Sequence, residues 1–491
     1  MKERYIIGMD IGTTGTKAIL FREDGTPVAH AYRGYTLSTP AVGRSEHDAE
    51  GYLCAVTETV KEVCKGQGVA DRVVSLAFST QGGTLIPVDK DGVPVRPAVV
   101  WNDHRCEAEK EAYIREMGDP TTVYEKTGWT LGDGLPLLTA RNLRDNEPDV
   151  FAKTAYFLSV PDFIAMRLTG RAAIDLSNAG INQFTDIRRR EYDEALLAFA
   201  GVKKEQLPPI VCSGDVVAPL SKEGAALLGL SEKTLLIAGA HDQYAVALGA
   251  GANRAGDILI GSGTCWVVTA IGNETDFESG LAQSVAAAHG LYGSLASLSS
   301  GGVCLEWLRK NVATANGEEL IDFKALDEEA AKRQAAFDGL FFFPFSGKHE
   351  KGYFSKASFT GLDLSHDRFH MARAVMEGVV FQILWFMESF KTKPDEKGIT
   401  LAGGASKSAV WAQMLADVSG LPVRLPSLPD LACVGAAILA GVGAGLYEDA
   451  RVGYTHFAAS ERTVLPNAEA HARYKTAFAE YKKQATALAS K

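Results

Sequence analysis

The stretch that decides the fold is Tyr5-Ile6-Ile7-Gly8-Met9-Asp10-Ile11-Gly12-Thr13-Thr14-Gly15-Thr16-Lys17. It runs from an apolar strand into a turn of glycine and threonine, with the carboxylate of Asp10 at the junction. Because burying a lone charge is costly, this carboxylate predicts a partner such as a metal ion. The turn offers backbone N–H groups and hydroxyls that suit phosphate oxygens. Together these features indicate chemistry on a magnesium nucleotide.

A simpler alternative is a β-hairpin whose aspartate only stabilises its own turn, and this stretch alone leaves both interpretations open. The turn is not a Walker P-loop, since Lys17 lies in a second predicted strand, residues 16–21, and no GxxxxGK[ST] precedes a helix. A third strand is predicted from Pro27 to Tyr35. The unit is therefore expected to be a meander.

The same pattern returns past the middle of the chain, where residues 256–270 read as strand, Gly/Ser/Thr turn and strand, followed by a third apolar run at 291–298. Two such units, each opening about half of the chain, predict two related domains that face each other across a central cleft. The small-residue stretch 249–256 is the expected hinge. We therefore expect domains at residues 1–252 and 253–491. Strand-like and helical segments alternate elsewhere, which favours an α/β fold.

Composition narrows the class of protein. The 491 residues fit two domains, and a net charge of −10 without a long basic run weighs against nucleic-acid and anionic-membrane partners. Seven scattered cysteines without CxxC spacing favour reduced thiols over a zinc site or a disulfide framework. The sequence enters a strand almost at once, without a signal peptide, so we expect a cytoplasmic protein. The apolar run 431–447 is short and rich in glycine and alanine, which favours an interior helix.

Asp242 is the second carboxylate of interest. It follows the predicted strand 235–239 and precedes a small, apolar helix. At the carboxyl end of a strand it could accept a proton from a substrate hydroxyl. Aspartate is also a favoured helix N-cap, and the sequence alone does not decide between a general base and a cap.

Two further segments combine groups that could bind ligands. Gly403-Gly404 lies between a predicted strand and a predicted helix, where glycine would let a nucleotide approach the backbone, although such a turn also needs glycine for its own conformation. Residues 101–105, Trp-Asn-Asp-His-Arg, join an aromatic platform to polar groups of the kind that bind polyols. A surface loop with its own ion pair explains the same residues equally well.

In order along the chain, these motifs resemble those of the FGGY carbohydrate kinases over nearly the whole length. The matching segments are DIGTTGTK at 10–17, WNDHR at 101–105, LTG at 168–170 with DLSNA at 175–179, AGAHDQ at 238–243, GSGT at 261–264, FFFPF at 341–345, RAVMEG at 373–378, LAGGASKS at 401–408 and GAA at 435–437. The resemblance implies two actin-like ATPase (ribonuclease H-like) domains, with ATP and a sugar bound in the cleft between them.

The resemblance also implies roles for single residues. Asp10 would hold Mg²⁺ through water, and Asp242 would be the general base. The nucleotide would be bound by Gly12, Thr13, Thr14, Lys17, Gly261, Ser262, Gly263, Thr264, Gly403, Gly404 and Ser406. The sugar would be bound by Thr80, Gln81, Trp101, Asn102, Asp103, Asp242 and Gln243. Residues 1–252 would then bind the sugar and supply the base, and residues 253–491 would bind the nucleotide.

The expected activity is ATP-dependent phosphorylation of a sugar hydroxyl, with a ketopentose such as xylulose as the first candidate. The xylulokinase-like QMHG pattern is replaced here by Ser79-Thr80-Gln81-Gly82, and His241 precedes the base. A deoxyketohexose, gluconate or a glycerol-like polyol therefore stays open. From a different class, an actin- or chaperone-like ATPase switch is the rival hypothesis. The expected partner is a small-molecule sugar or polyol, with no nucleic acid and no membrane, and a homodimer is compatible with this hypothesis.

Overall fold

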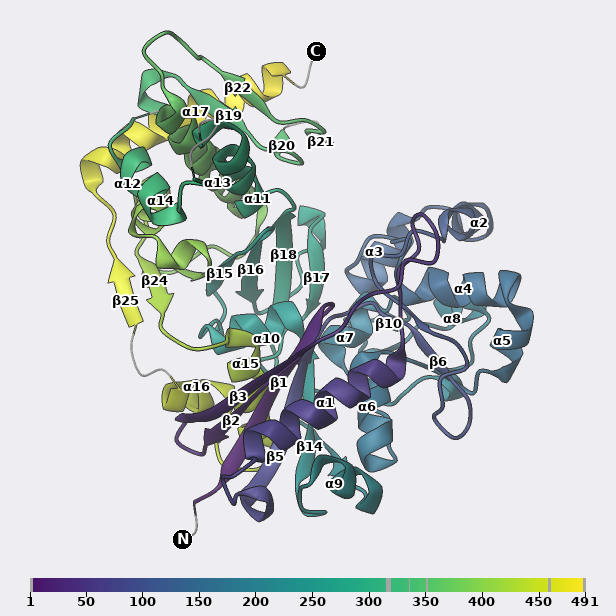
Figure 1. Cartoon of the computed structure of the whole chain (residues 1–491). Coiled ribbons are helices and arrows are strands. Elements are labelled where there is room, and N and C mark those ends of the chain that lie inside the picture. The colour runs from purple at the N-terminus through teal and green to yellow at the C-terminus, as the bar shows by residue number, and fades with distance from the viewer. Residues whose placement is uncertain (1–2, 315–318, 335, 350–351, 458–460, 489–491) are drawn as a thin grey trace. The chain divides into compact units, whose positions relative to one another are not determined.

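The chain forms two compact units (Figure 1). The computed structural model describes residues 3–314, 319–334, 336–349, 352–457 and 461–488. Unit 1 combines Met1–Ala255, Ile271–Ser294 and Leu428–Ala459, and unit 2 combines Gly256–Ala270, Leu295–Ser427 and Ser460–Lys491. Each unit is therefore assembled from segments that lie far apart in the sequence.

The sheet of unit 1 begins with the predicted meander. Strands β1 (Tyr5–Ile11), β2 (Gly15–Arg22) and β3 (Pro27–Gly34) pair antiparallel, which confirms that prediction. β5 (Val73–Thr80) lies parallel to β1, and β14 (Leu235–His241) lies parallel to β5. β13 (Val216–Pro219) closes the edge antiparallel to β14, which gives the order β13-β14-β5-β1-β2-β3.

The sheet of unit 2 repeats this topology. β15 (Ile258–Ser262) pairs antiparallel with β16 (Trp266–Gly272) and parallel with β23 (Ile399–Gly403). β23 pairs parallel with β24 (Val423–Pro426), and β25 (Glu461–Val464) pairs antiparallel with β24. β18 (Tyr292–Leu298), most of which belongs to this unit, lies beyond β16. Among the described strands, those from β18 to β25 match the first sheet in order, and β17 (Ala282–Val285) is an additional strand next to β18. The shared strand order confirms that the chain contains two related domains.

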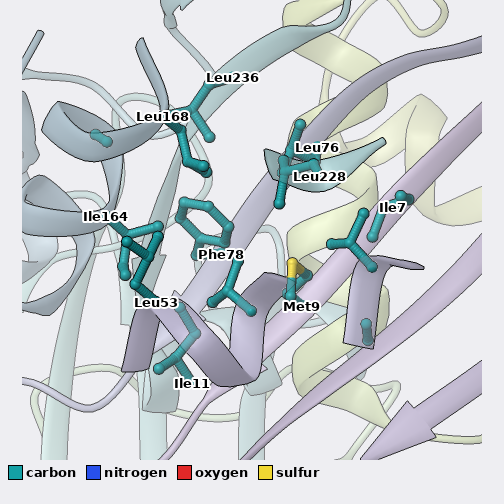
Figure 2. Packing of buried hydrophobic residues seen from close by; sticks show 14 of the residues in the cluster. Ile7, Met9, Ile11, Leu53, Leu76, Phe78, Ile164, Leu168, Leu228 and Leu236 are labelled. Atoms are coloured by element: carbon teal, nitrogen blue, oxygen red, sulfur yellow. The ribbon is translucent and has the colours of Figure 1, made fainter. Parts of the chain in front are cut away.

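The alternation of side chains along β1 determines which way Asp10 faces. Ile7, Met9 and Ile11 are fully buried in one cluster with Leu53 and Phe78 (Figure 2). Successive strand residues point to opposite faces of a sheet, so the even-numbered residues of β1 face the other side. Asp10 therefore shares its face with Gly8, away from this cluster.

A buried helix covers that second face. α15 (Leu431–Gly443) packs on β1 and β5, and it confirms the interior helix predicted from the apolar run. The contact is so close that a Cβ on Gly8 would lie 1.9 Å from the carbonyl oxygen of Cys433. On its other side, α15 packs against α10 (Asp242–Gly249), where a Cβ on Gly435 would lie 2.0 Å from the carbonyl oxygen of Ala245. Glycine is therefore required at both crossings.

α16 (Ala450–Phe457) packs against α15, and several other helices of unit 1 lie on the face of the first cluster or in a separate helical region. α1 (Ala49–Cys64) is capped by Asp48 and packs with α6 (Val160–Thr169) and α9 (Lys222–Leu228). A second core of buried side chains such as Tyr113, Leu138 and Phe199 lies among the helices of residues 107–200. These are α2 (Glu107–Met117), α3 (Thr121–Thr127), α4 (Pro136–Asn146), α5 (Pro148–Lys153) and α8 (Glu194–Ala200).

Unit 2 is built on a long helix, α13 (Arg368–Ser389), whose second half is largely buried. Phe381 of this helix and Phe341 of β19 (Phe341–Phe343) contact Tyr481 of α17 (Ala468–Leu488). The other helices of the unit are α11 (Gly302–Leu308), α12 (Phe323–Ala331) and α14 (Ala409–Ser419). Among the helices of the described residues, none is long and apolar enough to cross a bilayer.

Candidate active site

The turn between β1 and β2 is closed by its own backbone. The N–H of Gly12 donates to the carbonyl of Gly15 at 3.0 Å, and the hydroxyl of Tyr35 donates to the carbonyl of Gly12 at 2.5 Å. Thr13 Oγ1 donates to Gln81 Oε1 at 2.9 Å, so the turn is tied to the end of β5. These bonds hold the turn in one shape before any ligand binds.

Asp10 lies at the start of this turn, where its carboxylate contacts a hydroxyl and a lysine. Its Oδ1 accepts from Ser79 Oγ at 2.9 Å, and its Oδ2 lies 3.7 Å from Lys17 Nζ. Burial raises the pKa of Asp10 more than any other effect, and the negative charges of Asp430 and Asp242 raise it further. The positive charge of Lys17 lowers it, and the result is a pKa of about 6. Three carboxylates thus share a small region with one lysine, an arrangement that a divalent cation would relieve.

The described residues do not form a complete metal site from side chains alone. They contain no group of three or more His, Cys, Asp or Glu side chains arranged to hold a metal. Asp10 therefore fits a cation held mostly by water and phosphate oxygens, which is how Mg²⁺ commonly binds in phosphoryl-transfer sites.

Asp430 was not singled out from the sequence. Its Oδ2 accepts from Lys17 Nζ at 2.8 Å, while its Oδ1 accepts from the backbone N–H of Cys433 and so caps α15. The only signal in the sequence was an aspartate just before an apolar run, which is typical of any helix N-cap. Its approach to Asp10 depends on α15 crossing β1, a tertiary contact that no local pattern reveals.

The structure decides against the capping role that was considered for Asp242. β14 extends to His241, which is two residues further than predicted, and Asp242 is the first residue of α10. The N-cap position belongs to His241, and no side-chain cap bond is formed there. Instead, Asp242 Oδ1 accepts from Gln243 Nε2 at 3.1 Å and lies 3.3 Å from His241 Nε2.

Sheet register brings the two carboxylates to one edge. Ile11 of β1 pairs with Thr80 of β5, and Thr80 pairs with His241 of β14. The three parallel strands therefore end together, where ligands bind in open α/β sheets. The effect of Asp242 on the pKa of Asp10 agrees with this placement.

The polar side chains that follow β5 are partly engaged within the protein. Gln81 is buried between Thr13 and Tyr52, donating to the Tyr52 hydroxyl at 2.8 Å. Thr80 is fully buried, and its hydroxyl donates to Asn178 Oδ1 at 3.4 Å. These two residues shape the end of the strand, and Gln81 links it to the phosphate-type turn.

In the Trp-Asn-Asp-His-Arg segment, Trp101 and Asn102 keep groups that could contact a ligand, whereas Asp103 is fully engaged within the protein. Trp101 is 47% exposed, and its Nε1 donates to Thr13 Oγ1 at 3.0 Å. Asn102 has a buried Oδ1 without a hydrogen-bond partner among the described residues. Asp103 is different, because it is fully buried and accepts from the N–H of Ser45 at 2.7 Å and from Arg105 Nη2 at 2.8 Å. Asp103 therefore forms the ion pair with Arg105 that was the alternative to a polyol contact.

The DLSNA motif at 175–179 holds the end of β14 in place. Asp175 caps α7 (Leu176–Ile181) through the N–H groups of Ser177 and Asn178 and accepts from Asn178 Nδ2 at 2.7 Å. Burial raises the pKa of Asp175, against the effect of these bonds. Ser177 Oγ in turn accepts from the N–H of His241 at 2.9 Å. The motif thus anchors the end of the strand that precedes Asp242.

In unit 2, Ser262 joins the two glycine-rich turns. Its hydroxyl donates to the carbonyl of Ala402 and accepts from the N–H of Ala405 at 3.0 Å, and its carbonyl accepts from the N–H of Gly404 at 2.6 Å. Gly403 has a φ of +91°, and a Cβ there would lie 2.4 Å from the Ser262 carbonyl oxygen. The predicted nucleotide residues Gly261, Ser262, Gly403 and Gly404 therefore lie together at the ends of β15 and β23.

The rest of this cluster is ordered by short contacts. Gly263 donates its N–H to the carbonyl of Cys265 at 3.0 Å, and the carbonyl of Thr264 accepts from the N–H of Val303 at the start of α11. Ser406 Oγ donates to the carbonyl of Gly403 at 2.8 Å. Backbone N–H groups and small side chains line both turns, an environment that suits phosphate and ribose oxygens.

Comparison with known proteins agrees with the motifs. The model of the FGGY family of carbohydrate kinases matches in its N-terminal domain over residues 5–249 and in its C-terminal domain over residues 257–444. The L-xylulose/3-keto-L-gulonate kinase of Escherichia coli (strain K12) is 30% identical, with 99% of this chain and 97% of that protein covered. The gluconokinase of Bacillus subtilis (strain 168) is 28% identical over 91% of this chain and 88% of its own length. The crystal structure of xylulose kinase from Rhodospirillum rubrum superposes with a TM-score of 0.89 at 30% identity, with 98% of each chain covered.

Proposed function

The chain belongs to the FGGY family of carbohydrate kinases, and from that premise we propose that it transfers the γ-phosphoryl group of ATP to a hydroxyl of a ketopentose such as xylulose. Family membership makes it a phosphotransferase that acts on a small-molecule carbohydrate, with ATP as the donor. The particular sugar, Mg²⁺ and the role of each residue are the proposed part.

The observation that carries the mechanism is the placement of Asp242. It opens α10 at the sheet edge where β1 also ends, and its charge influences Asp10. Asp242 is assigned as the general base that takes the proton of the sugar hydroxyl. Phosphoryl transfer needs charge neutralisation and alignment more than covalent catalysis, so one well-placed base is sufficient.

The other residues are assigned by their surroundings. Asp10 would hold Mg²⁺, which when bound would neutralise negative charge on the phosphates. Lys17 and the turn Gly12 to Thr14 would face the phosphates. The turns of unit 2 would contact the rest of the nucleotide, through the residues Gly261, Ser262, Gly263, Thr264, Gly403, Gly404 and Ser406. The division of labour expected for residues 1–252 and 253–491 is part of this proposal.

On the sugar side, Gln243, Trp101 and Asn102 are assigned to contact hydroxyls, because Trp101 is partly exposed and Asn102 has an acceptor that no described residue satisfies. Thr80 and Gln81 are buried at the end of β5 and are assigned to shape the sugar site through their bonds to Asn178 and Thr13. Asp103 is assigned a positioning role instead, since Arg105 and Ser45 occupy its carboxylate.

Charge favours a neutral sugar over an aldonate such as gluconate. A carboxylate on the substrate would need a cation in the site. Arg105 is bonded to Asp103 and Glu46, and Lys17 to Asp430, so both of these cations already have anionic partners. The similarity to a xylulose kinase and to a kinase named for L-xylulose supports a keto sugar. The second kinase is also named for 3-keto-L-gulonate, a keto sugar with a carboxylate, so this acid is included in the test beside xylulose.

The test is a coupled assay of ADP release with ketopentoses, ketohexoses, aldonates, 3-keto-L-gulonate and polyols at equal concentrations. The highest kcat/KM is expected with a ketopentose. A clear preference for gluconate would overturn the proposed substrate while leaving the kinase assignment intact. ATP hydrolysis that no sugar stimulates would instead support the ATPase switch.

A further inference from the structure

His241, the last residue of β14, has no role in the mechanism described so far. Its side chain is buried, with the residue 5% exposed, and lies directly beside the proposed base. Its Nε2 is 3.3 Å from Asp242 Oδ1. The sequence placed a histidine before the base but gave no reason for it.

The imidazole of His241 is confined on several sides. The ring of Trp129 meets it edge-on at 6.0 Å between centroids, and the ring of Tyr244 lies 5.9 Å away. At Gly82 the backbone passes so close that a Cβ would lie 2.5 Å from His241 Cδ2. The backbone N–H of His241 is held by Ser177 Oγ. The ring therefore has little freedom to turn away from Asp242.

The surroundings of the other ring nitrogen indicate the tautomer. Nδ1 of His241 is buried and has no hydrogen-bond partner among the described residues. A buried N–H without an acceptor is rarer in proteins than an under-used acceptor, so Nδ1 is assigned as the nitrogen without hydrogen. The proton then belongs to Nε2, the nitrogen that faces the carboxylate.

Two N–H donors thus approach the same oxygen of Asp242. Gln243 Nε2 donates to Oδ1 at 3.1 Å, and His241 Nε2 is within reach of that same atom. Contacts of this kind often shorten when the substrate binds. Gln243 therefore holds Oδ1 by a hydrogen bond, and the confined His241 ring has its Nε2 3.3 Å from the same atom, so Oδ1 is the oxygen that both side chains approach.

We propose that His241 is a positioning residue that, together with Gln243, fixes Oδ1 of Asp242 so that Oδ2 is the atom that receives the sugar proton. The inference rests on the proposed role of Asp242 as the base. In the step itself, the hydroxyl proton passes to Oδ2 while the sugar oxygen bonds to the γ-phosphorus. The bond from that phosphorus to the bridging oxygen breaks, and its electron pair leaves on ADP.

Two substitutions of His241 distinguish the loss of its N–H donor from the loss of its packing volume. His241→Gln keeps an N–H donor at about the reach of Nε2, whereas His241→Leu fills similar space without a donor. Because small misplacements at a reacting centre can cost about 10²-fold, His241→Leu is expected to lower kcat by about that factor. His241→Gln is expected to stay within about tenfold of the wild type. KM for sugar and for ATP should be unchanged in both, because neither substrate loses a contact.

The control is His471→Leu, which removes an imidazole that bonds the carbonyl of Asp417 in unit 2 and should leave kcat unchanged. Thermal unfolding of every variant separates misfolding from loss of rate. Equal kcat in the leucine and glutamine variants of His241, whether both high or both low with a native melting curve, would overturn the inference. A rise in sugar KM with normal kcat would also overturn it, since His241 would then be contacting the substrate.

A double-mutant cycle tests whether both donors act on one atom. If His241 and Gln243 share Oδ1, the variant with both changed to leucine should lose more rate than the product of the single losses. Simple multiplication of the two losses would contradict a shared oxygen. Asp242→Asn is measured alongside: full activity of that variant would refute the proposed base itself. An inactive Asp242→Asn with an unaffected His241→Leu would refute only the role of His241.

Discussion

Lys17 donates from Nζ to Oδ2 of Asp430 at 2.8 Å, which joins two residues that are 413 positions apart in the sequence. Burial opposes the charge on Lys17, but the bond to Asp430 and the charge of Asp10 outweigh it and raise the pKa of the lysine. The ammonium group therefore stays charged beside the phosphate-type turn. Its position is set by a residue at the start of α15 rather than by the turn that contains it.

The first prediction concerns this ammonium group. If Lys17 contacts the phosphates, Lys17→Met should raise KM for ATP about tenfold, since a hydrogen bond to a charged group contributes about 1.5–3 kcal/mol. KM for the sugar should not change. Initial rates with each substrate varied in turn provide the measurement. An unchanged KM for ATP would remove Lys17 from the nucleotide site.

Asp430→Asn is the matched variant, because asparagine can still cap α15 while the charge is lost. Lys17 is 45% exposed at its side chain, so solvent screens the pair, and the free energy of unfolding should change by less than about 1 kcal/mol. A larger loss of stability would mean that Asp430 is mainly structural.

The second prediction links the charge of Asp10 to stability. Its pKa is about 6 in the folded protein against an ordinary value of 3.8, so ionisation of Asp10 destabilises the fold as the pH rises between these values. Below both values the penalty is absent, and above about pH 6 it is complete. Asp10→Asn should therefore stabilise the metal-free protein by up to about 3 kcal/mol at neutral pH and by much less near pH 4.

Chemical denaturation without Mg²⁺ at several pH values provides this measurement. Asp24→Asn is the control with the opposite sign, since the N–H of Thr26 holds the pKa of Asp24 below its usual range. That variant should become relatively less stable as the pH rises. If Asp10→Asn stabilised the protein equally at every pH, ionisation of Asp10 would not be what destabilises the fold.

The third prediction concerns the connection between the two turns of unit 2. Ser262 is buried and bonds both Ala402 and Ala405, so Ser262→Ala leaves two backbone groups unpaired. The expected cost is about 1–3 kcal/mol of unfolding free energy, together with a higher KM for ATP. Ser406→Ala is the comparison, because its single bond is exposed and should contribute less than about 1 kcal/mol. Equal destabilisation by the two variants would show that Ser262 does not join the turns.

The sequence was sufficient where the signal is local. The meander and its repeat follow from periodicity and turn chemistry, and the structure confirms them. Asp430 and the packing of His241 were missed because both depend on segments that meet only in the folded unit. Local pattern also left Asp242 ambiguous, since a cap and a base require the same residue at the same point. The extension of β14 to His241 removes the cap, and the role of Asp242 as the base stays a proposal.

The last prediction separates the neighbours Asn102 and Asp103. Asp103 is fully buried and Arg105 is 4% exposed at its side chain, so Asp103→Asn leaves a buried guanidinium without its main counter-charge and should destabilise unit 1 by about 3–5 kcal/mol. Asn102→Ala removes an acceptor that has no partner within the described part of the chain, so stability should hold while KM for the sugar rises.

Chemical denaturation and initial-rate kinetics of both variants measure these effects. Lys332→Met, which breaks the exposed ion pair with Glu329, is the control for surface ion pairs. The control should cost less than about 1 kcal/mol. If Asp103→Asn were as stable as the wild type but bound sugar weakly, Asp103 would contact the substrate after all. The burial of its carboxylate against Arg105 argues for the other outcome, in which Asp103 shapes the loop and Asn102 contacts the sugar.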